Sequence, residues 1–249
     1  AGNPTVAMVE AAFKHHGLNW RYVNMEVAPA DLAAAVGGVR AMGFRGFNLS
    51  MPHKVAVIEH LDGLGESASL IGAVNCVVER GGQLIGENTD GKGFLKSLQG
   101  VVDPRGKGIV LFGAGGAARA IAVELALAGA AKISIVNRDA DRGQGLASLL
   151  NEKTETESEW IAWSDMDALP VEAAIVINGT SIGLYDADAA LDFDLNSLQP
   201  GTVVADVVFN PVQTRLRREG AARDGVAADG RGMLVDRGVM GVQDWTGSN

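Results

Sequence analysis

A glycine-rich turn between a short apolar run and a helix constrains the fold of this sequence more than any other feature. The apolar run, residues 109–112, is typical of a buried strand, and the segment 117–128, rich in alanine and leucine, is typical of a helix. Glycines in such a turn permit a tight bend and a close approach of the backbone to a pyrophosphate, and the following helix offers free N–H groups to that anion. The turn therefore predicts a dinucleotide site whose contacts are Gly113, Ala114, Gly115, Gly116 and Ala117.

Helices and strands are predicted to alternate along most of the chain. After a break at residues 104–108, strands are predicted over 109–112, 132–136, 174–177 and 203–206, with helices over 117–128 and 140–150. This alternation predicts a doubly wound parallel sheet that is covered on both faces. The region before the break predicts a second α/β lobe, with helices over 7–17 and 30–42, strands over 20–27 and 46–49, and two strands around a glycine turn at 81–82.

Composition narrows the class of ligand and the cellular setting. The net charge of −9 disfavours a nucleic acid or an anionic membrane surface as partner, and the apolar runs are too short to cross a bilayer. A single cysteine, Cys76, excludes an internal disulfide, and the histidines have no spacing typical of a metal site. We therefore expect a cytoplasmic protein with small-molecule ligands and no metal; the oligomeric state, monomer or homodimer, stays open.

The end of the predicted strand over 132–136 bears on which dinucleotide is bound. It is followed by Asn137, Arg138 and Asp139. An arginine at this place pairs with the 2′-phosphate of NADP, and an asparagine donates a hydrogen bond without repelling it, whereas a carboxylate is typical of a site for the bare ribose of NAD. The turn favours NADP, and Asp139 leaves NAD open.

Polar residues gather in two segments of the first lobe, 48–54 and 88–91, on either side of a third segment at 72–75. A lysine and an aspartate at the ends of strands, here Lys54 and Asp90, could share a proton next to a carbonyl, as a reversible ketone reduction requires. By itself, a separation of 36 positions is more typical of two unrelated surface charges.

Seven segments in order resemble the shikimate dehydrogenase family, which includes quinate/shikimate dehydrogenases, across nearly the whole chain. The matching segments are 48–54 (Asn-Leu-Ser-Met-Pro-His-Lys), 72–75 (Gly-Ala-Val-Asn), 88–93 (Asn-Thr-Asp-Gly-Lys-Gly), 113–119, 137–138, 178–183 and 229–235. The resemblance implies an α/β fold of two domains. These are an α/β substrate-binding domain, residues 1–91 plus 230–249, and a Rossmann-type doubly wound NADP-binding domain, residues 92–229.

The resemblance also implies an activity, the NADP-dependent, reversible reduction of 3-dehydroshikimate to shikimate in the biosynthesis of chorismate and the aromatic amino acids. It makes Lys54 and Asp90 the catalytic pair, and makes Ser50 and Asn75 the residues that bind ring hydroxyls. It further places the nicotinamide near Asn178, Thr180, Ser181, Gly232 and Met233.

Four substitutions depart from the family pattern at the end of the site that holds the substrate carboxylate. Asn3 and Thr5 stand in place of two serines, Phe209 in place of a tyrosine, and Arg237 in place of a glutamine. All four remain predicted substrate contacts. The first strand and the final helix of the family are expected to be missing from this sequence. The alternatives are a quinate/shikimate dehydrogenase that uses NAD and a nucleotide-binding paralogue with little activity.

Overall fold

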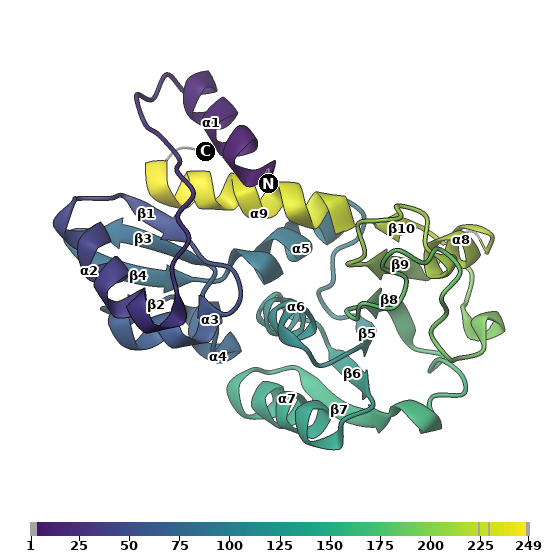
Figure 1. Cartoon of the computed structure of the whole chain (residues 1–249). Helices are drawn as coiled ribbons and strands as arrows, with labels where there is room; N and C mark the ends of the chain where they lie inside the picture. The colour runs from purple at the N-terminus through teal and green to yellow at the C-terminus, as the bar shows by residue number, and fades with distance from the viewer. Residues whose placement is uncertain (1–3, 224, 229, 248–249) are drawn as a thin grey trace. The chain divides into compact units, whose positions relative to one another are not determined.

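The computed structural model describes residues 4–223, 225–228 and 230–247, which form two compact units (Figure 1). The first unit comprises the chain up to Thr89 and from Val235 onward, and the second comprises Asp90–Leu234. Two helices, α5 (Thr89–Gln99) and α9 (Gly230–Thr246), contain residues of both units. The domain boundaries expected from the sequence, residues 1–91 plus 230–249 and residues 92–229, remain a prediction.

The second unit is built on a six-stranded sheet in which every recorded pairing is parallel. Its order is β10-β9-β8-β5-β6-β7, with bounds β5 (Gly108–Phe112), β6 (Lys132–Asn137), β7 (Glu157–Ala162), β8 (Ala173–Asn178), β9 (Val203–Asp206) and β10 (Ala227–Ala228). The strand order runs outward in both directions from β5 and β8. This confirms the predicted α/β fold class with a Rossmann-type doubly wound sheet.

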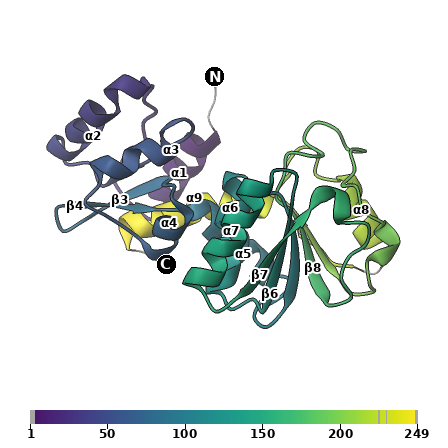
Figure 2. The ribbon, with the colours of Figure 1, turned by 90° about the horizontal axis from the view of Figure 1, so that it is seen from below.

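Helices cover this sheet on both sides (Figure 2). Helices α6 (Gly116–Leu127) and α7 (Ala140–Lys153) lie on one side, and α8 (Arg215–Ala221) packs on the other against β9. Residues 109–112 of β5 are buried on both faces, as a central parallel strand requires. The carboxyl ends of β5, β6, β8 and β9 therefore open onto the same edge of the sheet, where the loops that follow them meet.

The first unit has a smaller, mixed sheet of order β1-β3-β4-β2. Its strands are β1 (Gly46–Asn48), β2 (Gly63–Leu64), β3 (Cys76–Arg80) and β4 (Gln83–Glu87), and its helices are α1 (Pro4–His15), α2 (Leu32–Ala41), α3 (His53–Ala56) and α4 (Glu66–Ile71). Strand β3 pairs antiparallel with β1 and β4, whereas β2 pairs parallel with β4. An apolar cluster that includes Leu32, Val36, Val57 and Val77 forms its core.

The predicted strand over 20–27 is wrong, because the structure gives this segment no strand pairing. Its residues join no ladder; instead Tyr22 donates from its hydroxyl to Asn48 Oδ1 at 2.9 Å and packs against Trp245. Aromatic and β-branched residues favour an extended backbone, but a strand also needs a partner. Strand β7 was not expected, because its sequence alternates charged and apolar residues weakly.

No helix among the described residues has both the length and the apolar character to cross a membrane.

Candidate active site

The predicted dinucleotide turn lies at the carboxyl end of β5 and opens onto the start of α6. Gly113 has a φ of +106°, and a Cβ there would lie 3.0 Å from Thr180 Cγ2, so glycine is required on both grounds. At Gly115 and Gly116, by contrast, a Cβ would meet no heavy atom within 4 Å. The exposed first turn of a twelve-residue helix thus faces open space with free N–H groups, which fits the pyrophosphate of a dinucleotide.

A second loop, after β8, adjoins this turn because β8 pairs directly with β5. Asn178 is buried, and its Oδ1 accepts hydrogen bonds from Thr180 N at 3.0 Å and from Thr180 Oγ1 at 2.7 Å. Its Nδ2 donates to Ile182 O at 2.9 Å and to Asp206 Oδ1 at 3.0 Å. The side chain of Asn178 therefore shapes the loop that carries Thr180 and the exposed Ser181, both predicted cofactor contacts.

Asp206, at the end of β9, helps to hold this loop in place through its hydrogen bond with Asn178. Its carboxylate also accepts from Val208 N at 2.9 Å and from Thr214 Oγ1 at 2.7 Å. The residue is 1% exposed, and burial raises the pKa of its carboxyl above the ordinary range in spite of these hydrogen bonds. Asp206 was not among the residues singled out from the sequence, because its burial is a product of the sheet.

The third loop, after β6, holds the residues predicted to choose between NADP and NAD. Asp139 is the N-cap of α7 and accepts from Arg142 N at 3.1 Å. Asn137 donates from Nδ2 to Asp139 O at 2.8 Å, and the Arg138 guanidinium lies over the ring of Trp163. The carboxylate that argued for NAD is thus engaged in starting a helix.

In the first unit, the segments around Lys54 and Asn75 come together. Val74 N donates to Lys54 O at 2.7 Å, which joins α3 to the stretch before β3. Asn75 is buried, accepts from Thr89 N at 2.8 Å and donates from Nδ2 to Thr89 Oγ1 at 3.1 Å. Asp90 is the next residue along α5. Lys54 and Asp90 are each half-buried in their own units.

The remaining predicted substrate and cofactor contacts are distributed as follows. Ser50 is exposed, Thr5 is half-buried in α1, and Phe209 is 47% exposed in the loop after β9. Gly232 and Met233 lie in the first turn of α9. Asn3 lies outside the described residues, as does the side chain of Arg237.

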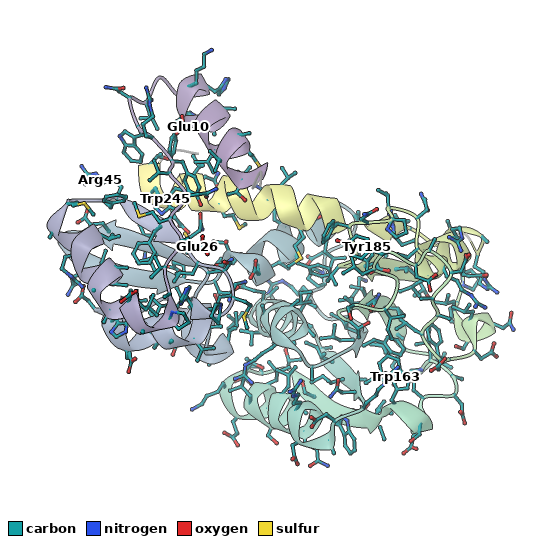
Figure 3. The ribbon with its side chains drawn as sticks, in the orientation of Figure 1. Glu10, Glu26, Arg45, Trp163, Tyr185 and Trp245 are labelled. Carbon is teal, nitrogen blue, oxygen red and sulfur yellow. The ribbon has the colours of Figure 1, made fainter. Side chains whose placement is uncertain are left out.

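Tyr185 is a feature of this region that the sequence did not reveal. It has a φ of 63°, which is rare for an aromatic residue, and the residue is 76% exposed (labelled in Figure 3). Its backbone N donates to Asn210 O at 2.9 Å, which ties the loop after β8 to the loop after β9. Within the described part of the chain, no group of three or more metal-ligating side chains is present.

A doubly wound parallel sheet with an open glycine turn, in a chain whose other α/β unit carries Lys54 and the buried, hydrogen-bonded Asn75, defines the class of two-unit dinucleotide-dependent dehydrogenases. Known proteins place the chain within this class. Family models described as "Shikimate dehydrogenase substrate binding domain" and "Shikimate / quinate 5-dehydrogenase" match residues 4–77 and 97–185.

Three relatives illustrate the similarity. The shikimate dehydrogenase (NADP(+)) of Desulforamulus reducens is 39% identical over 246 residues, which cover 97% of this chain and 84% of the relative. The crystal structure of a ligand-free 5-ketofructose reductase from a Gluconobacter strain matches with a TM-score of 0.95 and 57% identity over 100% of this chain and 90% of that one. Shikimate 5-dehydrogenase from Listeria monocytogenes, solved with shikimate and NAD, matches with a TM-score of 0.92 and 33% identity over 98% and 88%.

The chain belongs to the shikimate dehydrogenase family, whose members are oxidoreductases that act on a CH–OH group. The predictions of the family and of the enzyme class are thereby confirmed.

Proposed function

We propose that this chain is an NADP-dependent dehydrogenase that interconverts 3-dehydroshikimate and shikimate. The observation that carries the proposal is the position of the family's own polar residues: Asn75 is locked onto Thr89, one residue before Asp90, while the neighbouring residue Val74 holds the backbone of Lys54. Curated relatives named shikimate dehydrogenase (NADP(+)) support it over 97% of the chain. Neither a quinate/shikimate dehydrogenase that uses NAD nor a weakly active nucleotide-binding paralogue is favoured.

In the proposed reaction, Lys54 holds the proton that is transferred. Its ammonium would donate a proton to the substrate carbonyl oxygen during reduction, the neutral amine would take a proton from the hydroxyl during oxidation, and the role of the Asp90 carboxylate would be to stabilise the charged lysine. A bound reduced nicotinamide would supply the hydride. Asn75 has one Nδ2 hydrogen left after its bond to Thr89, which is available for a ring hydroxyl, and exposed Ser50 is available for another.

The residues that would hold NADP are those of the three adjoining loops. Gly115 and Gly116 at the start of α6 would bind the pyrophosphate, with Gly113, Ala114 and Ala117 shaping the turn. Asn137 and Arg138 would bind the 2′-phosphate, and Asp139 acts as the cap of α7. Asn178, Thr180, Ser181, Gly232 and Met233 are proposed to border the nicotinamide.

A second candidate function is the reduction of a neutral polyhydroxy ketone, and two observations favour it. Identity with the 5-ketofructose reductase is 57%, whereas identity with the shikimate dehydrogenases from D. reducens and L. monocytogenes is 39% and 33%. The four departures from the family pattern, Asn3, Thr5, Phe209 and Arg237, all fall where the family holds a carboxylate, a group that 5-ketofructose lacks. The proton donor Lys54 and the cofactor loops would serve both reactions.

One assay separates these functions. Purified protein is supplied with NADP+ or NAD+ and shikimate or quinate, and with NADPH and 5-ketofructose, while the absorbance of the reduced nicotinamide is followed. Turnover of shikimate with a higher kcat/KM for NADP+ than for NAD+ supports the first proposal. Turnover of the ketose with none of shikimate supports the second candidate, and no turnover of any of these substrates contradicts both.

The proposal extends to the setting of the enzyme. We infer that it acts in the cytoplasm, as a monomer or a homodimer, on small molecules.

A further inference from the structure

Two tryptophans, one in the edge strand β7 and one just beyond it, contact the end of β6 and the turn that follows it. Trp160, in β7, donates from its indole Nε1 to Asn137 O at 3.2 Å. Trp163, just beyond β7, carries the Arg138 guanidinium, whose Cζ lies 4.8 Å from the centroid of the indole ring. This distance is within the range of a cation–π contact, so the second indole holds the arginine side chain itself.

The Trp163 ring is fixed by packing against the core of the second unit (labelled in Figure 3). Its ring lies 5.5 Å from that of Phe112 in an edge-on arrangement, and Phe112 is itself stacked on Phe193 at 5.2 Å. Phe112 is fully buried at the end of β5, directly before the glycine turn. The Trp163 indole that contacts Arg138 is therefore packed against the end of the strand that carries the dinucleotide turn.

The charged side chains in the turn after β6 differ in whether an opposite charge offsets them. Asp139 is spent on capping α7 and lies 3.4 Å from Arg142 Nε, so Arg142 is partly neutralised. Among the described residues the recorded partner of Arg138 is the aromatic ring of Trp163 and no carboxylate. A ring attracts the guanidinium without cancelling its charge, so Arg138 keeps a full positive charge for an incoming anion.

We propose that Trp163 is a positioning residue for recognition of the cofactor's 2′-phosphate, because it holds the exposed Arg138 side chain in place before the cofactor binds. This inference rests on the proposed function, in which Arg138 contacts that phosphate. Without the indole, the long arginine side chain would lose conformational freedom when it binds the phosphate, so NADP would bind more weakly and the preference for NADP over NAD would fall. Trp163 itself contacts no part of the cofactor in this proposal.

The test measures binding by calorimetry, with adenosine 2′,5′-bisphosphate and adenosine 5′-monophosphate as matched probes that differ by the 2′-phosphate. In Trp163→Leu, binding of the bisphosphate is expected to weaken about two- to five-fold, the usual range for an exposed cation–π contact, and binding of the monophosphate to stay unchanged. In steady-state assays the KM for NADP+ rises by the same factor, while kcat and the KM for NAD+ do not change.

A double-mutant cycle tests whether the effect of Trp163 on binding of the bisphosphate depends on Arg138. If Trp163 acts through Arg138, the combination Arg138→Leu with Trp163→Leu binds the bisphosphate no more weakly than Arg138→Leu alone. Phe193→Leu is the matched control, because it disturbs the same aromatic cluster without contacting Arg138, and it should leave the ratio of the two probes unchanged.

A conservative variant guards against a folding defect. Trp163 Nε1 is buried without a hydrogen-bond partner among the described residues, so Trp163→Phe keeps an aromatic face and removes no hydrogen bond. This variant should retain most of the preference for the bisphosphate. In the unaltered protein, the bisphosphate should change tryptophan emission more than the monophosphate does, and this difference should vanish in Trp163→Phe.

The outcomes separate the inference from the proposed function. Equal weakening of both probes, additive effects in the double mutant, or an emission difference that persists in Trp163→Phe would each show that Trp163 has only a structural role. If Arg138→Leu leaves bisphosphate binding unchanged, the assignment of Arg138 to the phosphate fails as well. The proposed reaction itself fails separately, in the turnover assay.

Discussion

Lys54 is the residue on which the proposed chemistry depends most directly. Replacement by alanine removes the proton donor, and general acid catalysis contributes on the order of 10²- to 10⁴-fold to rate. We expect Lys54→Ala to lower kcat by about this factor, with little change in affinity for NADP+, because the cofactor loops belong to the other unit. Steady-state kinetics and cofactor titration measure both quantities.

Lys153→Ala, which removes an exposed lysine at the end of α7, is the control and should keep full activity. Unchanged turnover in Lys54→Ala would overturn the assignment of Lys54 as proton donor.

Asp206 makes stability depend on pH in a direction that can be derived. Because burial raises the pKa of its carboxyl, folding favours the protonated form. This contribution is complete below the pKa of the unfolded chain and is lost as pH rises through the higher pKa of the folded state. Asp206→Asn removes the titration and replaces one of the two acceptor oxygens by an NH2 group, so that it loses either the oxygen that binds Asn178 and Val208 or the one that binds Thr214, at a cost of about 1–3 kcal/mol.

We therefore expect the deficit in unfolding free energy of Asp206→Asn to be larger near pH 4 than near pH 7, in urea titrations at about these two values. Asp167→Asn, at an exposed aspartate, is the control and should show a smaller deficit. A deficit that grows as pH rises would contradict the direction of the pKa shift.

At the scale of elements, two glycines of the turn between β5 and α6 are expected to differ in role: Gly113 is needed for stability, and Gly115 for binding of the cofactor. Gly113→Ala should lower the unfolding free energy by about 1–3 kcal/mol, since the new methyl meets Thr180 at a φ of +106°. Gly115→Ala should cost at most about 1 kcal/mol of stability, because its methyl meets no protein atom, yet it should weaken NADP+ binding strongly by filling the space proposed for the pyrophosphate.

Gly145→Ala, in the exposed interior of α7, is the matched glycine control and should stabilise the protein by up to about 1 kcal/mol without affecting NADP+ binding. Denaturation curves and cofactor titrations test all three variants. Normal NADP+ affinity in Gly115→Ala would remove this turn from the proposed cofactor site.

The same elements show what sequence could and could not predict. The run 109–112 and its glycine turn were recognisable because a buried parallel strand and a positive-φ turn each restrict residue type strongly. Residues 20–27 favour an extended backbone as strongly, but pairing is a property of the neighbouring chain. The contact of Trp163 with Arg138 depends on the placement of β7 beside β6, which the weak alternation in 157–162 does not indicate.

At the scale of the whole molecule, each unit has a hydrophobic core of its own. Phe112 and Val176 belong to the core cluster of the second unit, whereas Val57 and Val77 belong to that of the first. All the residues proposed to contact the pyrophosphate and the 2′-phosphate lie in the second unit. Binding of NADP+ should therefore stabilise one core directly and leave the other close to its unliganded stability.

Hydrogen exchange measures this difference. A ligand at about 100 times its Kd stabilises the state that binds it by about 2.7 kcal/mol, so NADP+ should slow the exchange of the most protected amides of β5 and α6 by up to about a hundredfold. Amides of β3 and β4 should change much less, and Gly115→Ala should abolish the effect of NADP+ in both units. If β3 and β4 slow as much as β5, the two cores unfold as one cooperative unit, and the stability effects of Asp206→Asn and Gly113→Ala then belong to the whole chain.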